Sequence, residues 1–210
     1  MPLTPAQLAA LKANIAANTA QVGGVAINAL PQTPDNAFAV AAWYNLEAAG
    51  PFVVWRDLPM EDVLNLVTFA NMTPLDAVPS VTSLPANPTA AQNATYNNQV
   101  AALHIWNGRA NLCQSKQFNL QNLTLGRSTA PMRRSVYRAG LQDCLTNIPS
   151  GAAGATLAAN WVGVRDGAKF NATNAEKVFA TGAGTTAATA DLSFEGAITG
   201  DEVQAAWELP

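Results

Sequence analysis

Charge is scarce in this sequence. Lys, Arg, Asp and Glu make up 12% of the 210 residues, and hydrophobic residues make up 49%. The charged share is about half that of an ordinary soluble protein. A surface this poor in charge is typical of a protein that partners partly cover. The alternative is that Ala, Asn, Thr and Gln replace charge on an uncovered surface.

Other scarcities argue against whole classes of site. The chain has one histidine, His104, without a second His or an acid cluster to complete a metal site. Cys113 and Cys144 are expected to be buried thiols, with a disulfide as the alternative. Gly151 and Gly154 lack the following Lys-Ser/Thr of a phosphate loop. We therefore predict no catalytic residue, no cofactor and no metal, and an enzyme is the least favoured class.

Long apolar runs are also missing. No stretch of 18 consecutive apolar residues exists, so we predict no membrane-spanning helix. The opening sequence MPLTPAQLAALK lacks the basic region and apolar core of a secretory signal, and we expect none.

The charge that is present is unevenly distributed. Residues 1–76 carry a net charge of −4, residues 77–142 carry +6 without one acid, and residues 181–210 carry −5 without one cation. Segregated charge favours complementary contacts between copies or with a partner. It also fits neutralisation within one monomer, or contact between the arginines and DNA phosphates. The residues expected to contact partners are Arg127, Arg133, Arg134, Arg138, Asp191, Phe194, Glu195, Asp201, Glu202 and Trp207.

Helical periodicity, with start and stop signals, predicts an all-α fold. Thr4-Pro5, Thr33-Pro34 and Thr199 with Glu202 are typical helix starts, whereas Gly50-Pro51 and Gly126 are typical ends. The expected helices span about 4–18, 33–49, 59–69, 96–116, 130–147, 154–180 and 199–209, and the fourth could continue, bent, to 125. Short extended or strand segments are expected at 52–56 and 190–195.

Two segments are predicted to stand apart from the helical bundle. Residues 79–95 contain three prolines and many small polar residues, which indicates a long surface loop acting as a contact arm or mobile segment. After Gly182 and Gly184, residues 181–210 combine five acids with few apolar anchors. We therefore predict a helical body at 1–180, with the loop at 79–95, and an extended C-terminal arm at 181–210 that carries a short β element.

Several blocks of the sequence are similar to a known group of proteins. They read TPAQLAALK, DNAFAVAAWYN, FVVWR, WNGRANLCQSKQFNLQNLTLGR, RAGLQDCLTNIPSG, NATNAEKVFATGAG and SFEGAIT. In these blocks the chain resembles small virion proteins of tailed bacteriophages, and among them the head–tail adaptors that ring the portal. It departs from the smallest adaptors in its length and in the 79–95 loop.

The resemblance implies a non-enzymatic structural role at the neck of the virion, after assembly in the host cytoplasm. It implies a homo-oligomeric ring that binds the portal protein and tail or neck proteins, with non-specific contact to packaged DNA. It also implies a C-terminal arm that reaches toward the portal or a neighbouring subunit. The alternatives are a tail-completion or minor capsid or decoration protein and, from another class, a non-specific DNA-binding accessory protein.

Overall fold

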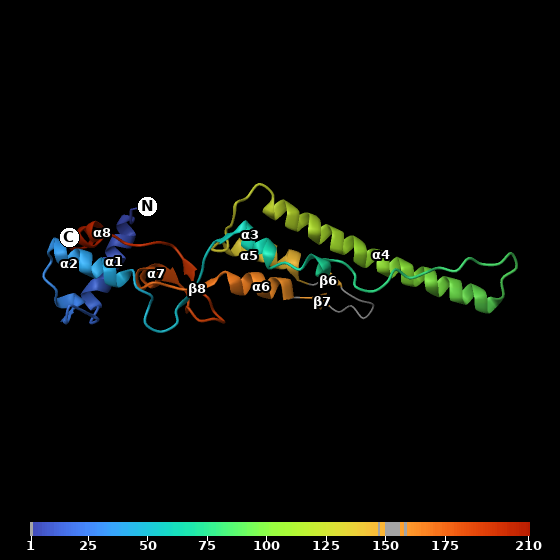
Figure 1. Cartoon of the computed structure of the whole chain (residues 1–210), viewed down its shortest axis with the longest axis horizontal. Helices are drawn as coiled ribbons and strands as arrows, with labels where there is room; N and C mark the ends of the chain where they lie inside the picture. The colour runs from blue at the N-terminus through green and yellow to red at the C-terminus, as the bar shows by residue number, and fades with distance from the viewer. Residues whose placement is uncertain (1, 147, 150–155, 158) are drawn as a thin grey trace. The chain divides into compact units, whose positions relative to one another are not determined.

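The structure, a computed structural model, describes residues 2–146, 148–149, 156–157 and 159–210. These residues are mostly helical, as the sequence predicts, and contain eight α-helices (Figure 1). The α-helices are α1 (Pro5–Ala17), α2 (Pro34–Tyr44), α3 (Met60–Asn65), α4 (Ala90–Thr124), α5 (Ser135–Leu145), α6 (Ala159–Gly167), α7 (Asn174–Phe179) and α8 (Gly200–Glu208). Two short 3-10 helices, η1 (Ile27–Ala29) and η2 (Phe69–Met72), accompany them.

The strands are two or three residues long and pair antiparallel in twos, β1 with β2, β3 with β8, β4 with β5, β6 with β7 and β9 with β10. They are β1 (Gln21–Val22), β2 (Val25–Ala26), β3 (Val53–Trp55), β4 (Leu58–Pro59), β5 (Thr129–Ala130), β6 (Ile148–Pro149), β7 (Thr156–Leu157), β8 (Lys169–Asn171), β9 (Ala180–Thr181) and β10 (Asp191–Leu192). The strands expected near 52–56 and 190–195 are therefore present in shorter form.

Threonine caps explain where several helices begin. Four helices begin with a capping box. The cap threonine side chain accepts a hydrogen bond from the backbone N–H three residues on, and the Gln or Glu side chain at that position accepts one from the backbone N–H of the threonine. The cap residues are Thr4, Thr89, Thr173 and Thr199. The starts predicted at Thr4, Thr33 and Thr199 are confirmed.

Other helix bounds differ from the expectation. α4 begins at Ala90 instead of Tyr96, because Thr89 caps it, and it continues through Gly108 to Thr124. The single helix expected over 154–180 is two helices, because Lys169–Asn171 pairs with Val53–Trp55 and Thr173 caps a new start. Its expected beginning at Gly154 lies outside the described residues.

The remaining expected helices are shorter in the structure. α2 ends at Tyr44, and α3 covers Met60–Asn65 before η2 follows. α5 begins at Ser135 because Thr129–Ala130 is paired with Leu58–Pro59 in a sheet. Local pairing with distant segments thus replaces the first or last turns of several predicted helices.

The chain divides into two compact units, and not into a body at 1–180 and an arm at 181–210. The first unit combines Met1–Arg56 with Lys169–Pro210, and the second is Asp57–Ala168. In the first unit α8 packs against α1 and α2. The buried core of this unit includes Leu11, Ile15, Val40, Tyr44, Ala175, Phe179, Val203, Ala206 and Trp207. Residues 200–208 therefore belong to a core, because the apolar residues of α8 lie on one face and are covered.

The second unit is organised around the C-terminal part of α4. There α4 packs on α5, and α5 packs on α6. The buried side chains of this unit include Val63, Met72, Cys113, Leu120, Met132, Tyr137, Leu141, Cys144, Leu145, Trp161 and Val164. Gly167 lies close to Leu66, since a Cβ added there would come within 2.9 Å of the leucine Cδ1.

Candidate functional site

The predicted basic contact residues lie in one stretch of the second unit and are largely engaged there. Arg133 donates to Asp57 at 3.1 Å, and its backbone N–H donates to the same carboxylate. Arg138 donates to the carbonyl oxygens of Met132 and Arg133 at 2.6 and 2.9 Å, which fixes the turn before α5. These two arginines therefore order their own unit.

Arg127 and Arg134 have exposed side chains. The Arg127 guanidinium lies 5.7 Å from the centroid of the Tyr137 ring, a distance that suits a cation–π contact. Burial raises the pKa of the Tyr137 hydroxyl, and Arg127 opposes this shift. Arg134 is the residue before α5, and its backbone forms the N-cap without a side-chain cap bond.

Three of the six cations in the acid-free window, residues 77–142, pair with carboxylates of the second unit. Arg109 makes a two-pronged ion pair with Asp76, at 2.9 and 2.5 Å. Lys116 is buried and lies 3.6 Å from the Asp143 carboxylate, and it also donates to the Asp143 carbonyl oxygen. Together with the Arg133–Asp57 pair, these contacts show that half of the six positive charges are neutralised within one monomer. The acids come from before and after the window, and none of these three comes from residues 181–210.

The predicted contact residues of the C-terminal segment, two aromatic and four acidic, all lie in the first unit. Trp207 is 9% exposed and forms part of the core, so it is not an exposed anchor. Phe194 is half-buried against Phe179, with ring centroids 5.2 Å apart. Glu202 caps α8 and accepts a hydrogen bond from the Leu3 backbone N–H at 2.9 Å. The remaining members of the set, Asp191, Glu195 and Asp201, are exposed, and their role in partner binding stays a prediction.

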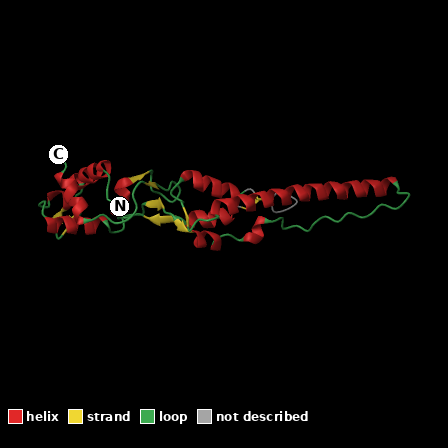
Figure 2. Cartoon of the chain, turned by 90° about the horizontal axis from the view of Figure 1, so that it is seen from above, coloured by secondary structure: helices red, strands yellow, loops and turns green. Residues whose placement is uncertain are grey.

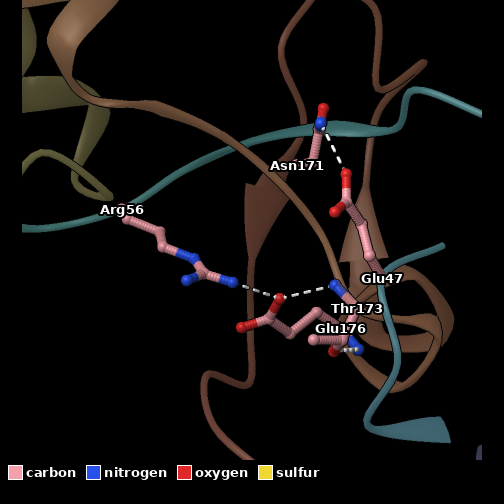
Figure 3. A network of polar contacts seen from close by, with 5 residues as sticks. All are labelled: Glu47, Arg56, Asn171, Thr173 and Glu176. Atoms are coloured by element: carbon pink, nitrogen blue, oxygen red, sulfur yellow. Dashed lines mark hydrogen bonds and ion pairs between the residues drawn. The ribbon is translucent and has the colours of Figure 1, made fainter.

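A buried carboxylate organises a polar network in the first unit (Figure 3). Glu176 is 1% exposed and accepts from Arg56 at 2.7 Å and from the Thr173 backbone N–H at 2.9 Å. Nearby, Asn171 donates to Glu47 at 2.7 Å. Removing one partner of such a buried pair typically costs about 3–5 kcal/mol. The network ties β3 and the start of α7 together, which is a structural use of its charges.

The largest cleft described in the first unit is lined by amides and aromatic rings. It holds about 470 Å³ between α1, α2 and α7 and is lined by Asn14, Ala17, Asn18, Thr19, Trp43, Tyr44, Asn174, Lys177 and Val178. The fully buried Tyr44 donates to Asn14 at 2.7 Å and accepts from Asn18 at 3.2 Å. Burial raises the pKa of this hydroxyl, with the Asn18 bond opposing. These polar groups satisfy one another.

The feature that most distinguishes the second unit is an arm, residues 73–112. Residues 73–89 run in an extended path beside the first 23 residues of α4 (Figures 1 and 2). The structure describes every residue of the arm, and none of them is buried. Residues 77–108 carry no Lys, Arg, Asp or Glu. We call this element the α4 arm.

Side-chain hydrogen bonds fix the antiparallel register of the α4 arm. Trp106 donates from its indole to the Asp76 carbonyl oxygen at 3.1 Å. Farther out, the Thr82 backbone N–H donates to Gln99 at 2.9 Å. At the base, Gln117 donates to the Met72 carbonyl oxygen at 2.8 Å. Hydrogen bonding to Arg109 lowers the pKa of the Asp76 carboxyl, so this part of the register depends on an ionised carboxylate.

The two thiols are buried, as predicted, and no disulfide joins them. Burial raises the pKa of both Cys113 and Cys144, which disfavours the reactive thiolate. Among the described residues, no group of three or more His, Cys, Asp or Glu side chains could hold a metal ion. In the same part of the chain, no helix combines the length and hydropathy needed to cross a membrane.

Sequence reasoning placed a contact loop at 79–95 but missed that the arm is half helix. Thr89 with Gln92 is the capping box that would have moved the helix start to Ala90. Comparison of the chain with protein-family models, curated proteins and solved structures finds no match.

Proposed function

We propose that this chain is a non-enzymatic structural protein of a tailed-phage particle, with the role of a head–tail adaptor that forms a ring on the portal at the neck. The resemblance of its sequence blocks to phage connector proteins supports the virion context. In this proposal α4, α5 and α6 supply the helical bundle of the adaptor. The observation that carries the assembly role is the exposed α4 arm.

The α4 arm is poorly stabilised by its own composition. Its helical part contains a glycine, Gly108, and five asparagines, and both residue types are weak helix formers. The asparagines are Asn93, Asn97, Asn98, Asn107 and Asn111. Within residues 90–108 no acid and no Lys or Arg is available for stabilising i,i+4 ion pairs. Because helices of this kind gain most of their stability from packing, an exposed helix of about six turns favours a partner that covers it.

Low surface charge supports the same function. The arm presents exposed apolar side chains, among them Val78 and Ile105, in a stretch without Lys, Arg, Asp or Glu over residues 77–108. Surfaces of this type are usually covered in an assembly. A connector ring, in which each copy is flanked by copies and stacked on other neck proteins, provides such cover.

Imaging and mass measurement of the purified protein test this function. Native mass spectrometry and negative-stain images, with and without portal protein, should show rings or ring-shaped additions to the portal. A chain that stays monomeric at high concentration and leaves the portal unchanged would contradict the adaptor role. Antibody labelling of particles separates the alternatives, because a tail-completion protein labels the tail end and a decoration protein labels the head shell.

A DNA-binding accessory role is the second candidate, and the exposed residues Arg127 and Arg134 favour it. Two exposed arginines near a helix start support phosphate contact without base reading. We expect weak duplex binding that falls steeply with salt, and Arg127→Gln with Arg134→Gln should abolish it. Sub-micromolar, sequence-selective binding at physiological salt would place this role first.

A further inference from the structure

α4 carries two stripes of residues at alternating three- and four-residue spacing. The first stripe faces its own unit, is buried or half-buried, and consists of Tyr96, Gln99, Leu103, Trp106, Ala110, Cys113, Gln117 and Leu120. It makes the contacts that hold the α4 arm, including the Trp106 bond to Asp76 and the Gln99 bond to Thr82. This inner stripe explains why the helix packs on one side.

The second stripe lies on the opposite side of α4. Each of its eight residues is exposed, and none is charged. Its members, which we call the outer stripe, are Ala91, Ala94, Asn98, Ala101, Ile105, Gly108, Leu112 and Ser115. At about 100° per residue its centre lies roughly 150° around the helix from the inner stripe. Ile105 and Leu112 are 63% and 45% exposed, one heptad apart.

This spacing is the heptad pattern of a helix that packs along another helix. Asn98, Ile105 and Leu112 occupy one core position of the heptad, and Ala101 and Gly108 occupy the other. Gly108 has open space around it, since a Cβ there would meet nothing within 4 Å. Glycine weakens a helix interior relative to alanine, and nothing in its own unit requires it. A backbone that approaches closely from outside would require it.

Charge and polarity indicate that the approaching helix is the same helix of a second copy. A charged stripe would repel itself in a contact between copies, whereas an uncharged one does not. Asn98 is the one amide at a core position, and in a parallel pair in register it faces Asn98 of the second copy, where each amide both donates and accepts. A single asparagine of this kind sets register and orientation in helix pairs.

We infer that α4 helices of two copies of this chain pair in parallel and in register through the outer stripe. This pairing specifies one contact of the proposed assembly. It rests on the proposed function only in assuming that copies of this chain assemble with one another. The stripe spans 25 residues, about 37 Å of helix, and is built mainly from small side chains. It therefore buries an area at the low end for specific complexes. Isolated pairs should therefore be weak, and because a parallel pair in register closes at two copies, a ring would need further contacts through other surfaces.

Disulfide trapping tests the pairing in the full chain. Ala101→Cys places thiols at a facing core position, where a parallel pair brings Cα atoms into the range of about 4.4–6.8 Å that a disulfide spans. Asn107→Cys is the matched control, since residue 107 is also exposed on α4 but lies about 120° around the helix from Ala101. Under mild oxidation, Ala101→Cys should give at least tenfold more covalent dimer than Asn107→Cys. Equal yields, or no dimer from either variant, would overturn the inference.

Charge repulsion gives an independent readout that does not depend on oxidation. Ile105→Glu places like charges against each other in the pair, and it should raise the concentration at which copies associate by at least tenfold. Asn107→Glu adds the same charge outside the stripe and should leave association unchanged. Circular dichroism should show both variants folded as the unaltered chain is, because neither side chain is buried. Association that is unaffected by Ile105→Glu would overturn the pairing.

The failure of the pairing and that of the adaptor role are distinguishable. Rings on the portal that persist with Ile105→Glu, without Ala101→Cys dimers, would refute the pairing and retain the adaptor role. Ala101→Cys dimers from a protein that leaves the portal unchanged would support the pairing and contradict the adaptor role. A monomer that neither traps nor binds portal would contradict both.

Discussion

Composition predicts contact arms at residues 181–210 and at residues 79–95, which belong to the α4 arm, yet the structure uses these two segments in opposite ways. α8 contains three acidic residues and no basic one, yet its apolar residues Val203, Ala206 and Trp207 are buried in the core of the first unit, where α8 packs against α1 and α2. The α4 arm has no charge over residues 77–108 and buries none of its residues. The comparison shows that net charge does not determine which segment leaves a fold. What matters is whether the apolar side chains of a helix lie on one face and find a surface to cover them.

The largest expected effect is that of removing the C-terminal helix. Deletion of residues 200–210 should unfold the first unit, because it takes Val203, Ala206 and Trp207 from the core and exposes the faces of α1 and α2. Circular dichroism should show a loss of helix well beyond the nine residues of α8. A folded first unit after this deletion would restore the view of a docking arm.

The matched deletion removes the outer part of the α4 arm. Residues 78–107 can be replaced by a short linker, because Asp76 and Arg109, which form an ion pair at the base of the arm, are both retained. The second unit should then unfold cooperatively, at a denaturant midpoint close to that of the full chain. Global unfolding of the second unit would show that the arm is part of its core.

Two tryptophans compare the regions side chain by side chain. Trp207→Ala should lower the free energy of unfolding of the first unit by about 3–5 kcal/mol, as expected for a large core side chain. Trp106→Ala, at a half-buried site on the arm, should cost the second unit about 1 kcal/mol, mainly through its hydrogen bond to Asp76. Urea titrations followed by circular dichroism measure both losses. Equal losses would remove the contrast between core helix and arm.

The base of the arm should respond to acid. Because Arg109 lowers the pKa of the Asp76 carboxyl in the folded state, this pair stabilises the register above the ordinary pKa of an aspartate. The stabilisation should disappear as pH falls through the lower folded pKa. The indole N–H resonance of Trp106, which reports its bond to Asp76, should shift in that range. Asp76→Asn should abolish the acid-dependent shift, and an unaltered transition would show that another group causes it.

The smallest expected effect is at the outer stripe in the monomer. Ile105→Ser should change the unfolding free energy of the dilute, monomeric chain by less than about 0.5 kcal/mol, because the side chain is mostly exposed. Val203→Ser, in the core of the first unit, serves as the comparison and should be clearly destabilising. Thermal unfolding at low protein concentration measures both. A large loss from Ile105→Ser in the monomer would show that the stripe already packs within the chain.

Local signals in the sequence determined much of this protein. Threonine caps with Pro, Gln or Glu at the following positions determined where α1, α2 and α8 begin, because these side chains satisfy backbone N–H groups without help from the rest of the chain. The sequence also shows directly that charge is scarce and that the chain has one histidine and two cysteines. The two cysteines were predicted to be buried thiols, which the structure confirms. The same local chemistry at Thr89 was present but was not used to place the start of α4.

Only the tertiary structure decided how distant segments combine. The pairing of Val53–Trp55 with Lys169–Asn171 splits the predicted sixth helix, and no local pattern encodes a partner more than a hundred residues away. Local patterns also do not encode the ion pairs of Arg109 with Asp76 and of Arg133 with Asp57, whose partners are 33 and 76 residues apart. Periodicity shows that a helix has an apolar face, but it does not show which surface covers that face. For this reason the acidic α8 became part of a core, whereas α4 kept one stripe exposed.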